Sequence, residues 1–276
     1  MASIGALLEQ AAAATVDAGA MMLPVAYPQP AADAGDVLQR VLPATGAIRQ
    51  RLKSLVQAQD RTRVHSAVRG RRVHSRSLHR APVGDPRIFE RRDEQPAVNT
   101  AVHLVIDTSG SMSSRIGVTC DAALALAIAL HGIPKVTVSA AAFPGNGIAV
   151  ADKRSAVAEV LRPGVDPRRR AGAFVLPAGG GTPLTGALVH GAAVLLTQHD
   201  VERRLMLVLH DGDPNDPPGT LAVIARLRAR DIEFLGIGIQ TDAVRAYFPD
   251  HVVVNELADL RSALFQATRR ALAASA

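Results

Sequence analysis

From residue 102 onward, short runs of consecutive aliphatic residues alternate with longer stretches typical of helices. The aliphatic runs predict five strands, at residues 102–106, 135–143, 204–209, 232–239 and 251–254. The stretches between them predict helices at residues 119–131, 155–161, 184–197, 220–230, 244–248 and 257–273. Strands that alternate with helices at this spacing indicate an α/β fold with a doubly wound, mostly parallel sheet flanked by helices.

The first hundred residues lack this alternation. Residues 1–48 are rich in Ala and contain four prolines, which predicts one or two short helices and a loop. Residues 48–59 predict a helix, and residues 61–78 have a mixed pattern in which Gly70 is placed to turn a β-ribbon. We therefore predict an N-terminal segment (residues 1–48), a basic helical and extended arm (residues 49–95) and the α/β domain (residues 96–276).

Composition supports a sheet that is covered on both faces. The chain has 276 residues, of which 48% are hydrophobic but only 3% aromatic, so its core must be built from Ala, Val, Leu and Ile. Such residues suit parallel strands, which read as continuous aliphatic runs. The single cysteine, Cys120, cannot form an internal disulfide and lies in an Ala/Leu-rich stretch, so we interpret it as a small core residue of a protein in a reducing compartment.

The positive charge of the chain is concentrated in the predicted arm. Residues 49–92 carry thirteen Arg or Lys against three Asp or Glu, a net charge of +10, whereas the whole chain is +6 and the remainder is therefore −4. Such an arm could bind nucleic acid, but it contains Phe89 as its only aromatic residue, and single-strand binders generally use aromatic stacking. The sequence therefore favours an acidic protein partner over nucleic acid.

No apolar run reaches the roughly 20 residues that span a bilayer, and the N-terminus lacks the basic flank of a signal peptide. We therefore expect a cytoplasmic protein without a membrane segment.

Polar side chains that suit a metal ion follow the predicted strands. Residues 107–112, with the sequence Asp-Thr-Ser-Gly-Ser-Met, come directly after the first strand. Thr182 follows a run of three glycines, and Asp211 follows the strand at residues 204–209. Turns after buried strands are where open α/β sheets bind ligands, and oxygen ligands from separate loops are what Mg²⁺ requires. The sequence therefore predicts a magnesium site.

These three segments resemble the metal-ion-dependent adhesion site of von Willebrand factor A (VWA) domains, in which the metal ligands would be Asp107, Ser109, Ser111, Thr182 and Asp211. The resemblance implies that the three hydroxyls contact Mg²⁺ directly, with Mn²⁺ as an alternative ion, and that the two aspartates act largely through bound water. It also implies that an Asp or Glu of a partner completes the coordination sphere.

Further stretches are similar to one branch of this family. Residues 83–89, 207–216, 236–239 and 244–249 resemble the CobT-type subunit of aerobic cobaltochelatase and the NorD-type activator of nitric-oxide reductase. The resemblance implies a subunit that is not itself catalytic and works with a MoxR-like AAA+ ATPase on a third, target protein. The chain is short and lacks a long acidic linker, so the prediction is a metal-dependent interaction subunit rather than cobalt insertion specifically.

Other interpretations of the same residues stay open at this point. Asp107 and Ser109 could cap the following segment, and Thr182 before Pro183 could cap a helix. A Mg²⁺-dependent hydrolase would need a base, for which His210 is the only ionisable neighbour of Asp211 in sequence, although as the last residue of a strand it is expected to pack beside the sheet.

Two further features of the sequence are interpreted structurally. Asp213 and Asp216 lie in a Pro-rich turn and are read as solvated turn residues. Gly236 and Gly238 fit no nucleotide-binding motif and are read as positions of close helix-to-sheet packing.

Overall fold

A computed structural model describes residues 25–26, 34–56, 63–67, 72–73, 89–93, 99–145, 156–212 and 214–259. The chain divides into two compact units. The first comprises Met1–Val56 and Asn99–Ala276, and the second comprises Gln57–Val98.

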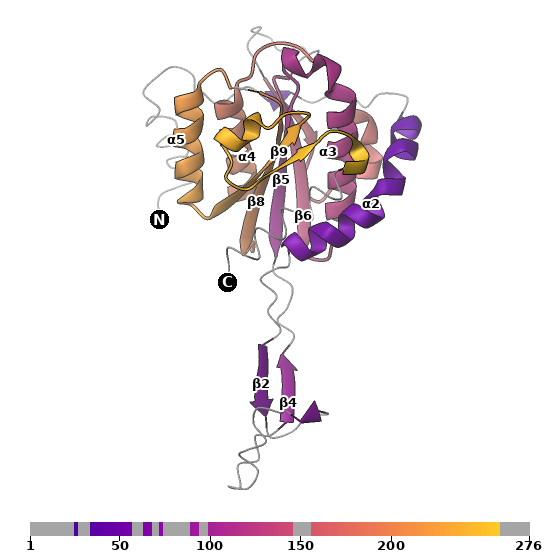
Figure 1. Cartoon of the computed structure of the whole chain (residues 1–276), viewed down its shortest axis with the longest axis vertical. Helices are drawn as coiled ribbons and strands as arrows, with labels where there is room; N and C mark the ends of the chain where they lie inside the picture. The colour runs from indigo at the N-terminus through magenta and orange to yellow at the C-terminus, as the bar shows by residue number, and fades with distance from the viewer. Residues whose placement is uncertain are drawn as a thin grey trace. The chain divides into compact units, whose positions relative to one another are not determined.

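The first unit contains a seven-stranded sheet with helices on both sides (Figure 1). Its strand order is β1-β7-β6-β5-β8-β9-β10, and all neighbours are parallel except β6 and β7. The predicted α/β architecture with a mostly parallel sheet is therefore confirmed. The strands are β1 (Val25–Ala26), β5 (Thr100–Asp107), β6 (Val136–Phe143), β7 (Val157–Leu161), β8 (Arg203–His210), β9 (Ile232–Ile239) and β10 (His251–Val254).

The helices cover the two faces of this sheet as two separate apolar clusters. On one face, α3 packs against the even-numbered residues of β5 and α2 packs on α3. On the other face, α4 packs against the odd-numbered residues of β5, and α5 packs against α4 and β9. The helical elements are α2 (Ala34–Val56), η2 (Gly110–Ser114), α3 (Ile116–His131), η3 (Pro167–Phe174), α4 (Leu184–Leu196), α5 (Pro217–Arg228), η4 (Ala243–Ala246) and η5 (Leu257–Asp259). No helix within these described ranges is long and apolar enough to cross a membrane.

The helix predicted at residues 155–161 is wrong, because Val157–Leu161 form the strand β7 instead. The alternation of strands and helices suggested a helix at this position. In the structure, the chain returns antiparallel to β6, and Val157, Ala158, Val160 and Leu161 are all buried. A short run buried on both faces, with two β-branched residues, suits a strand better than an amphipathic helix.

Helix α2 is longer than the sequence pattern predicted and contains Pro43. It runs from Ala34 to Val56 and includes the described part of the helix expected at residues 48–59, so the boundary expected between residues 48 and 49 falls inside it. Apolar residues at helical spacing bury one face of α2 in the cluster that contains α3: Val37, Val41, Ile48 and Leu52. Packing on α3 therefore makes α2 part of the first unit.

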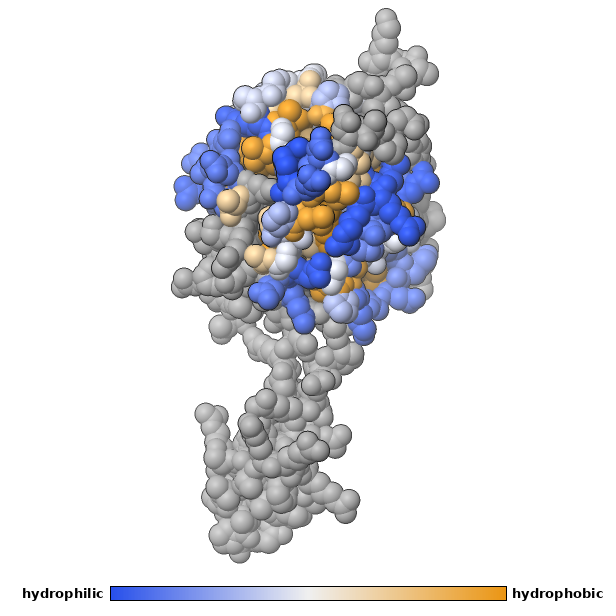
Figure 2. Space-filling model, turned by 90° about the vertical axis from the view of Figure 1, so that its right-hand side faces the viewer, coloured by the Kyte–Doolittle hydropathy of each residue, from blue (hydrophilic) through white to orange (hydrophobic). Residues whose placement is uncertain are grey.

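The side of the molecule that carries α2 presents hydrophobic residues interspersed with hydrophilic ones (Figure 2). Leu42 on α2, for example, is 41% exposed.

Cys120 on α3 is buried, as expected of a small core residue, and burial raises the pKa of its thiol to about 11. This thiol therefore stays protonated at neutral pH and is a weak nucleophile.

The second unit contains a three-stranded antiparallel sheet of order β2-β4-β3. Its strands are β2 (Arg63–Ala67), β3 (Arg72–Val73) and β4 (Phe89–Asp93). Gly70 lies outside the described residues, and the strands on either side of it, β2 and β3, each pair with β4 and not with each other. Most of the helix predicted at residues 257–273 lies outside the described residues, which end in η5.

Gly191 on α4 is predicted to tolerate no side chain. A Cβ at this position would lie 2.7 Å from His103 Cδ2 and 3.0 Å from Met206 Cε, because α4 packs closely on the sheet here. Gly191→Ala is expected to lower the free energy of unfolding by about 1–3 kcal/mol through overpacking. Gly117→Ala in α3 is the matched control, since a Cβ there meets nothing within 4 Å. Gly117→Ala is expected to raise the free energy of unfolding by about 0.4–1 kcal/mol. Urea titration measures both variants. Equal effects of the two variants would show that close packing at Gly191 does not cause the destabilisation.

Candidate metal centre

The predicted site residues lie at the carboxyl ends of the two central strands. Asp107 is the last residue of β5, His210 is the last residue of β8, and Asp211 follows it. These strands are parallel neighbours, with Ile106 opposite Leu209. The register therefore brings both carboxylates to the same edge of the sheet, as expected for a ligand site in an open α/β sheet.

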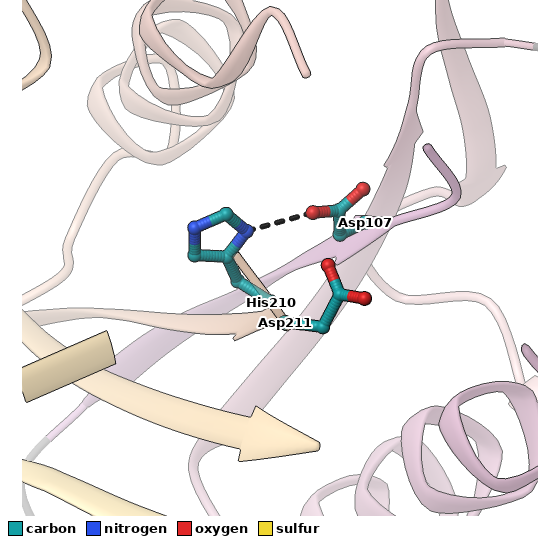
Figure 3. A group of neighbouring side chains, drawn as sticks. All are labelled: Asp107, His210 and Asp211. Carbon is teal, nitrogen blue, oxygen red and sulfur yellow. Dashed lines mark hydrogen bonds and ion pairs between the residues drawn. The ribbon is translucent and has the colours of Figure 1, made fainter. Parts of the chain in front are cut away.

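Asp107 is held by hydrogen bonds to both of its carboxylate oxygens. Oδ1 accepts from the backbone N–H of Ser109 at 2.8 Å, and Oδ2 lies 2.7 Å from His210 Nδ1. The imidazole of His210 points at the Asp107 carboxylate, and both side chains are completely buried (Figure 3). A buried carboxylate with two such partners is fixed in orientation before any ligand arrives.

The two serines of the first loop connect this loop to Asp211. Ser111 Oγ donates to Asp211 Oδ1 at 3.0 Å, and Ser109 Oγ lies 3.0 Å from Ser111 Oγ. Because the single hydroxyl proton of Ser111 goes to Asp211, Ser109 is the donor in the second bond. The other oxygen of Asp211 accepts from Arg115 Nη1 at 3.1 Å. The first and third predicted segments therefore form one hydrogen-bonded group.

The loop that carries Thr182 lies against both of these segments. Gly110 donates its N–H to Gly180 O at 3.0 Å. Thr182 exchanges two bonds with Asn215, since its N–H donates to Asn215 Oδ1 at 2.9 Å and its carbonyl accepts from Asn215 N at 3.0 Å. All three loops predicted from the sequence thus meet at one edge of the sheet.

The capping roles considered for Ser109 and Thr182 do not fit the structure, whereas Asp107 does accept from the Ser109 N–H at the start of the following segment. Ser109 precedes η2 without a side-chain capping bond, and α4 begins at Leu184 with Pro183, not Thr182, as its N-cap. The expected role of Asp216 as a solvated turn residue is wrong. Its side chain caps α5 by accepting from Gly219 N at 3.0 Å, and Pro217 occupies the first turn of that helix. Asp213 lies outside the described residues.

The interpretation of His210 as a residue that packs beside the sheet is only partly right. It is buried at the end of a strand as expected, but it bonds to Asp107 rather than only packing beside the sheet. Its position next to Asp211, at the end of the strand beside β5, was the available signal. Arg115 was missed altogether, because nothing in the sequence between Ser111 and α3 indicates which way its side chain points.

The buried groups at this edge can hold a divalent cation. One ligand atom from each of Asp107, His210 and Asp211 lies within 4.8 Å of the others, and all three residues are buried. The hydroxyls of Ser109 and Ser111 bond to the same group. Carboxylate and hydroxyl oxygens suit Mg²⁺ or Mn²⁺, and an imidazole is acceptable to Mn²⁺ but less favourable for Mg²⁺.

Comparison with known proteins supports the fold rather than a function. No protein-family model matches the sequence, and no curated protein matches it. Among solved structures, the vWF domain of the type V pilus tip protein Mfa5 from Porphyromonas gingivalis has a TM-score of 0.51 at 9% identity, covering 64% of this chain and 96% of that one. The fold is that of a VWA domain.

A second structure with the same TM-score is the pilus adhesin SpaC from Lactobacillus rhamnosus GG, at 16% identity. The match covers 64% of this chain and 31% of SpaC, so the chain spans about a third of the length of that adhesin. A von Willebrand factor type A structure from Catenulispora acidiphila is also similar, with a TM-score of 0.46, 18% identity and coverage of 64% of this chain and 43% of that one. The fold shared with the SpaC and Mfa5 structures agrees with the fold that the resemblance in the sequence implies.

Proposed function

We propose that this chain is a metal-dependent protein-interaction subunit, in which a divalent cation at the carboxyl end of the sheet captures an acidic side chain of a partner. The observation that carries the proposal is the group formed by Asp107, Ser109, Ser111 and Asp211, which joins two loops through buried and part-buried hydrogen bonds. The similarity to a pilus adhesin and a pilus tip protein also favours a role in protein binding.

The residues of the centre would have different roles in binding the cation. Ser109, Ser111 and Thr182 offer neutral hydroxyl oxygens, while Asp107 and Asp211 supply the negative charge that attracts the cation. When bound, Mg²⁺ or Mn²⁺ supplies a positive charge that is only partly compensated by neutral ligands and an open position for a carboxylate. The buried bonds to Asp107 keep the first loop in place, so little conformational entropy is lost when the partner binds.

The proposed partner is a MoxR-like AAA+ ATPase together with its target protein. Support for this assignment comes from the resemblance of four stretches to CobT-type and NorD-type subunits, and the role would be to transmit ATP-driven movement to the target. The end of β8 and the loop after it, which carry part of this resemblance, also carry His210 and Asp211 of the candidate metal centre. No catalytic residue is assigned, because the resemblance implies a subunit that is not itself catalytic.

Retention of an AAA+ ATPase from the native lysate provides the test. Immobilised wild-type chain is expected to retain it in Mg²⁺ and release it in EDTA, while Asp107→Asn retains none. Asp121→Asn, which removes an acid on α3 that pairs with Arg40, is the control and should retain it normally. Retention by Asp107→Asn in EDTA as strong as that of the wild type in Mg²⁺ would refute metal-dependent capture.

A further inference from the structure

Arg115 places a positive charge directly on the candidate metal centre. It lies between η2 and α3, and its Nη1 is 3.1 Å from Asp211 Oδ2. The Arg115 side chain is 29% exposed, whereas that of Asp211 is 1% exposed. A partly solvated guanidinium therefore serves as the counter-ion of a nearly inaccessible carboxylate.

This contact completes the pairing of the acidic groups at the centre. Asp107 has Ser109 N–H and His210 as partners, and Asp211 has Ser111 and Arg115. Each of the four carboxylate oxygens thus has a hydrogen-bonding partner before any metal is bound. A divalent cation that uses Asp211 would meet a carboxylate whose charge Arg115 already balances, and it would be repelled by the guanidinium.

The local backbone allows the Arg115 side chain to move without the helix. Its N–H donates to Met112 O at 2.8 Å, and its carbonyl accepts from Thr119 N and Thr119 Oγ, each at 3.0 Å. These bonds hold the main chain at the start of α3, whereas the guanidinium is held by Asp211. A guanidinium has five N–H donors in a planar fork that fits a carboxylate, so it can exchange one carboxylate for another.

We propose that Arg115 is an internal counter-cation of the metal centre, which competes with the divalent cation for Asp211 and is taken over by the carboxylate of the bound partner. This inference rests on the proposed function and adds that binding of the metal is coupled to binding of the partner. A partner carboxylate that accepts from Arg115 frees Asp211 for the cation. Metal and acidic ligand therefore bind cooperatively, and each is weaker without the other.

Titration of the metal-free chain with Mn²⁺, with free Mn²⁺ read by electron paramagnetic resonance, tests the competition. Arg115→Met, which removes the charge but keeps an unbranched side chain, is expected to bind Mn²⁺ about tenfold more tightly than the wild type. Arg115→Lys keeps the charge and is expected to bind like the wild type. Arg40→Met, which removes the exposed partner of Asp121, is the control and should change nothing.

Mn²⁺ binding by Arg115→Met that is no tighter than that of the wild type would overturn the inference. If Arg115 only held Asp211 in place, Arg115→Met would bind Mn²⁺ as weakly as the wild type or more weakly, with its melting temperature showing that it is folded. A wild-type chain that binds no Mn²⁺ or Mg²⁺ would refute the proposed function itself, which separates the two failures.

The cooperativity is tested with acetate as the carboxylate probe and chloride at equal ionic strength as the control. Acetate is expected to tighten Mn²⁺ binding by the wild-type chain and to have a much smaller effect on Arg115→Met, in which Asp211 is already free. An equal response of both proteins to acetate would show that Arg115 is not the group that the carboxylate displaces.

Discussion

Asp107→Asn is expected to lower the affinity of the chain for Mg²⁺ and Mn²⁺ by about 10- to 100-fold, as for other residues that support a metal site through hydrogen bonds or bound water. The substitution removes one of the two negative charges at the centre and keeps the shape of the side chain. The Asn oxygen can still accept from Ser109 N–H, and its amide can donate to His210 Nδ1 if that ring changes tautomer. Isothermal titration calorimetry measures the change.

The control for this variant is Asp121→Asn, which removes a carboxylate that is 16% exposed and pairs with Arg40 on α2. It should leave metal affinity unchanged, because Asp121 contacts another helix rather than the centre. Thermal unfolding should show both variants folded. Unchanged metal affinity in a folded Asp107→Asn variant would mean that the cation binds elsewhere on the chain.

Acid is expected to destabilise the protein steeply between pH 6.5 and about 3, in part through His103. Burial against α4 lowers the pKa of this residue to about 3, and burial also lowers the pKa of His190. Below pH 6.5 the unfolded chain binds a proton at position 103 that the folded chain does not bind. The free energy of unfolding therefore falls by roughly 1.4 kcal/mol for each pH unit from this residue alone, until the pH reaches its pKa in the folded protein.

His103→Asn isolates this contribution, because it removes the titrating ring while an amide can still bond to Ser139, whose Oγ lies 2.8 Å from His103 Nδ1. The free energy of unfolding, measured with urea across this pH range, should depend on pH with a slope that is smaller by about one proton, whatever the stability of the variant at pH 7. Met206→Leu changes the packing next to the same ring without removing a proton, and it should keep the wild-type slope. The same slope in His103→Asn would mean that other groups account for the acid sensitivity.

The central strands and their ends could be predicted from sequence because the signal there is local. Strands β5, β6, β8 and β9 are continuous aliphatic runs, which only a sheet covered on both faces explains well. Asp107 and Asp211 follow two of these runs directly, so the rule that ligands bind at the carboxyl ends of parallel strands placed them together. The core role of Gly236 could also be predicted, since a Cβ there would lie 2.8 Å from Phe248 Cδ2.

Features that depend on tertiary packing could not be predicted in the same way. A helix was expected at β7 because strands and helices alternate along the chain, whereas the structure pairs this segment antiparallel with β6. The start of α2 is set by its packing on α3 despite Pro43. Arg115 reaches Asp211 because η2 and α3 direct its side chain there, and no spacing rule connects residues 96 positions apart.

The most direct test of the account is a titration of the metal-free wild-type chain with Mn²⁺, monitored by electron paramagnetic resonance. We expect one Mn²⁺ to bind per chain and excess Mg²⁺ to displace it. In Asp107→Asn, the affinity for Mn²⁺ is expected to be strongly reduced. A chain that binds no Mn²⁺, or binds it equally well after Asp107→Asn, would contradict the claim that the carboxyl end of this sheet is a metal centre.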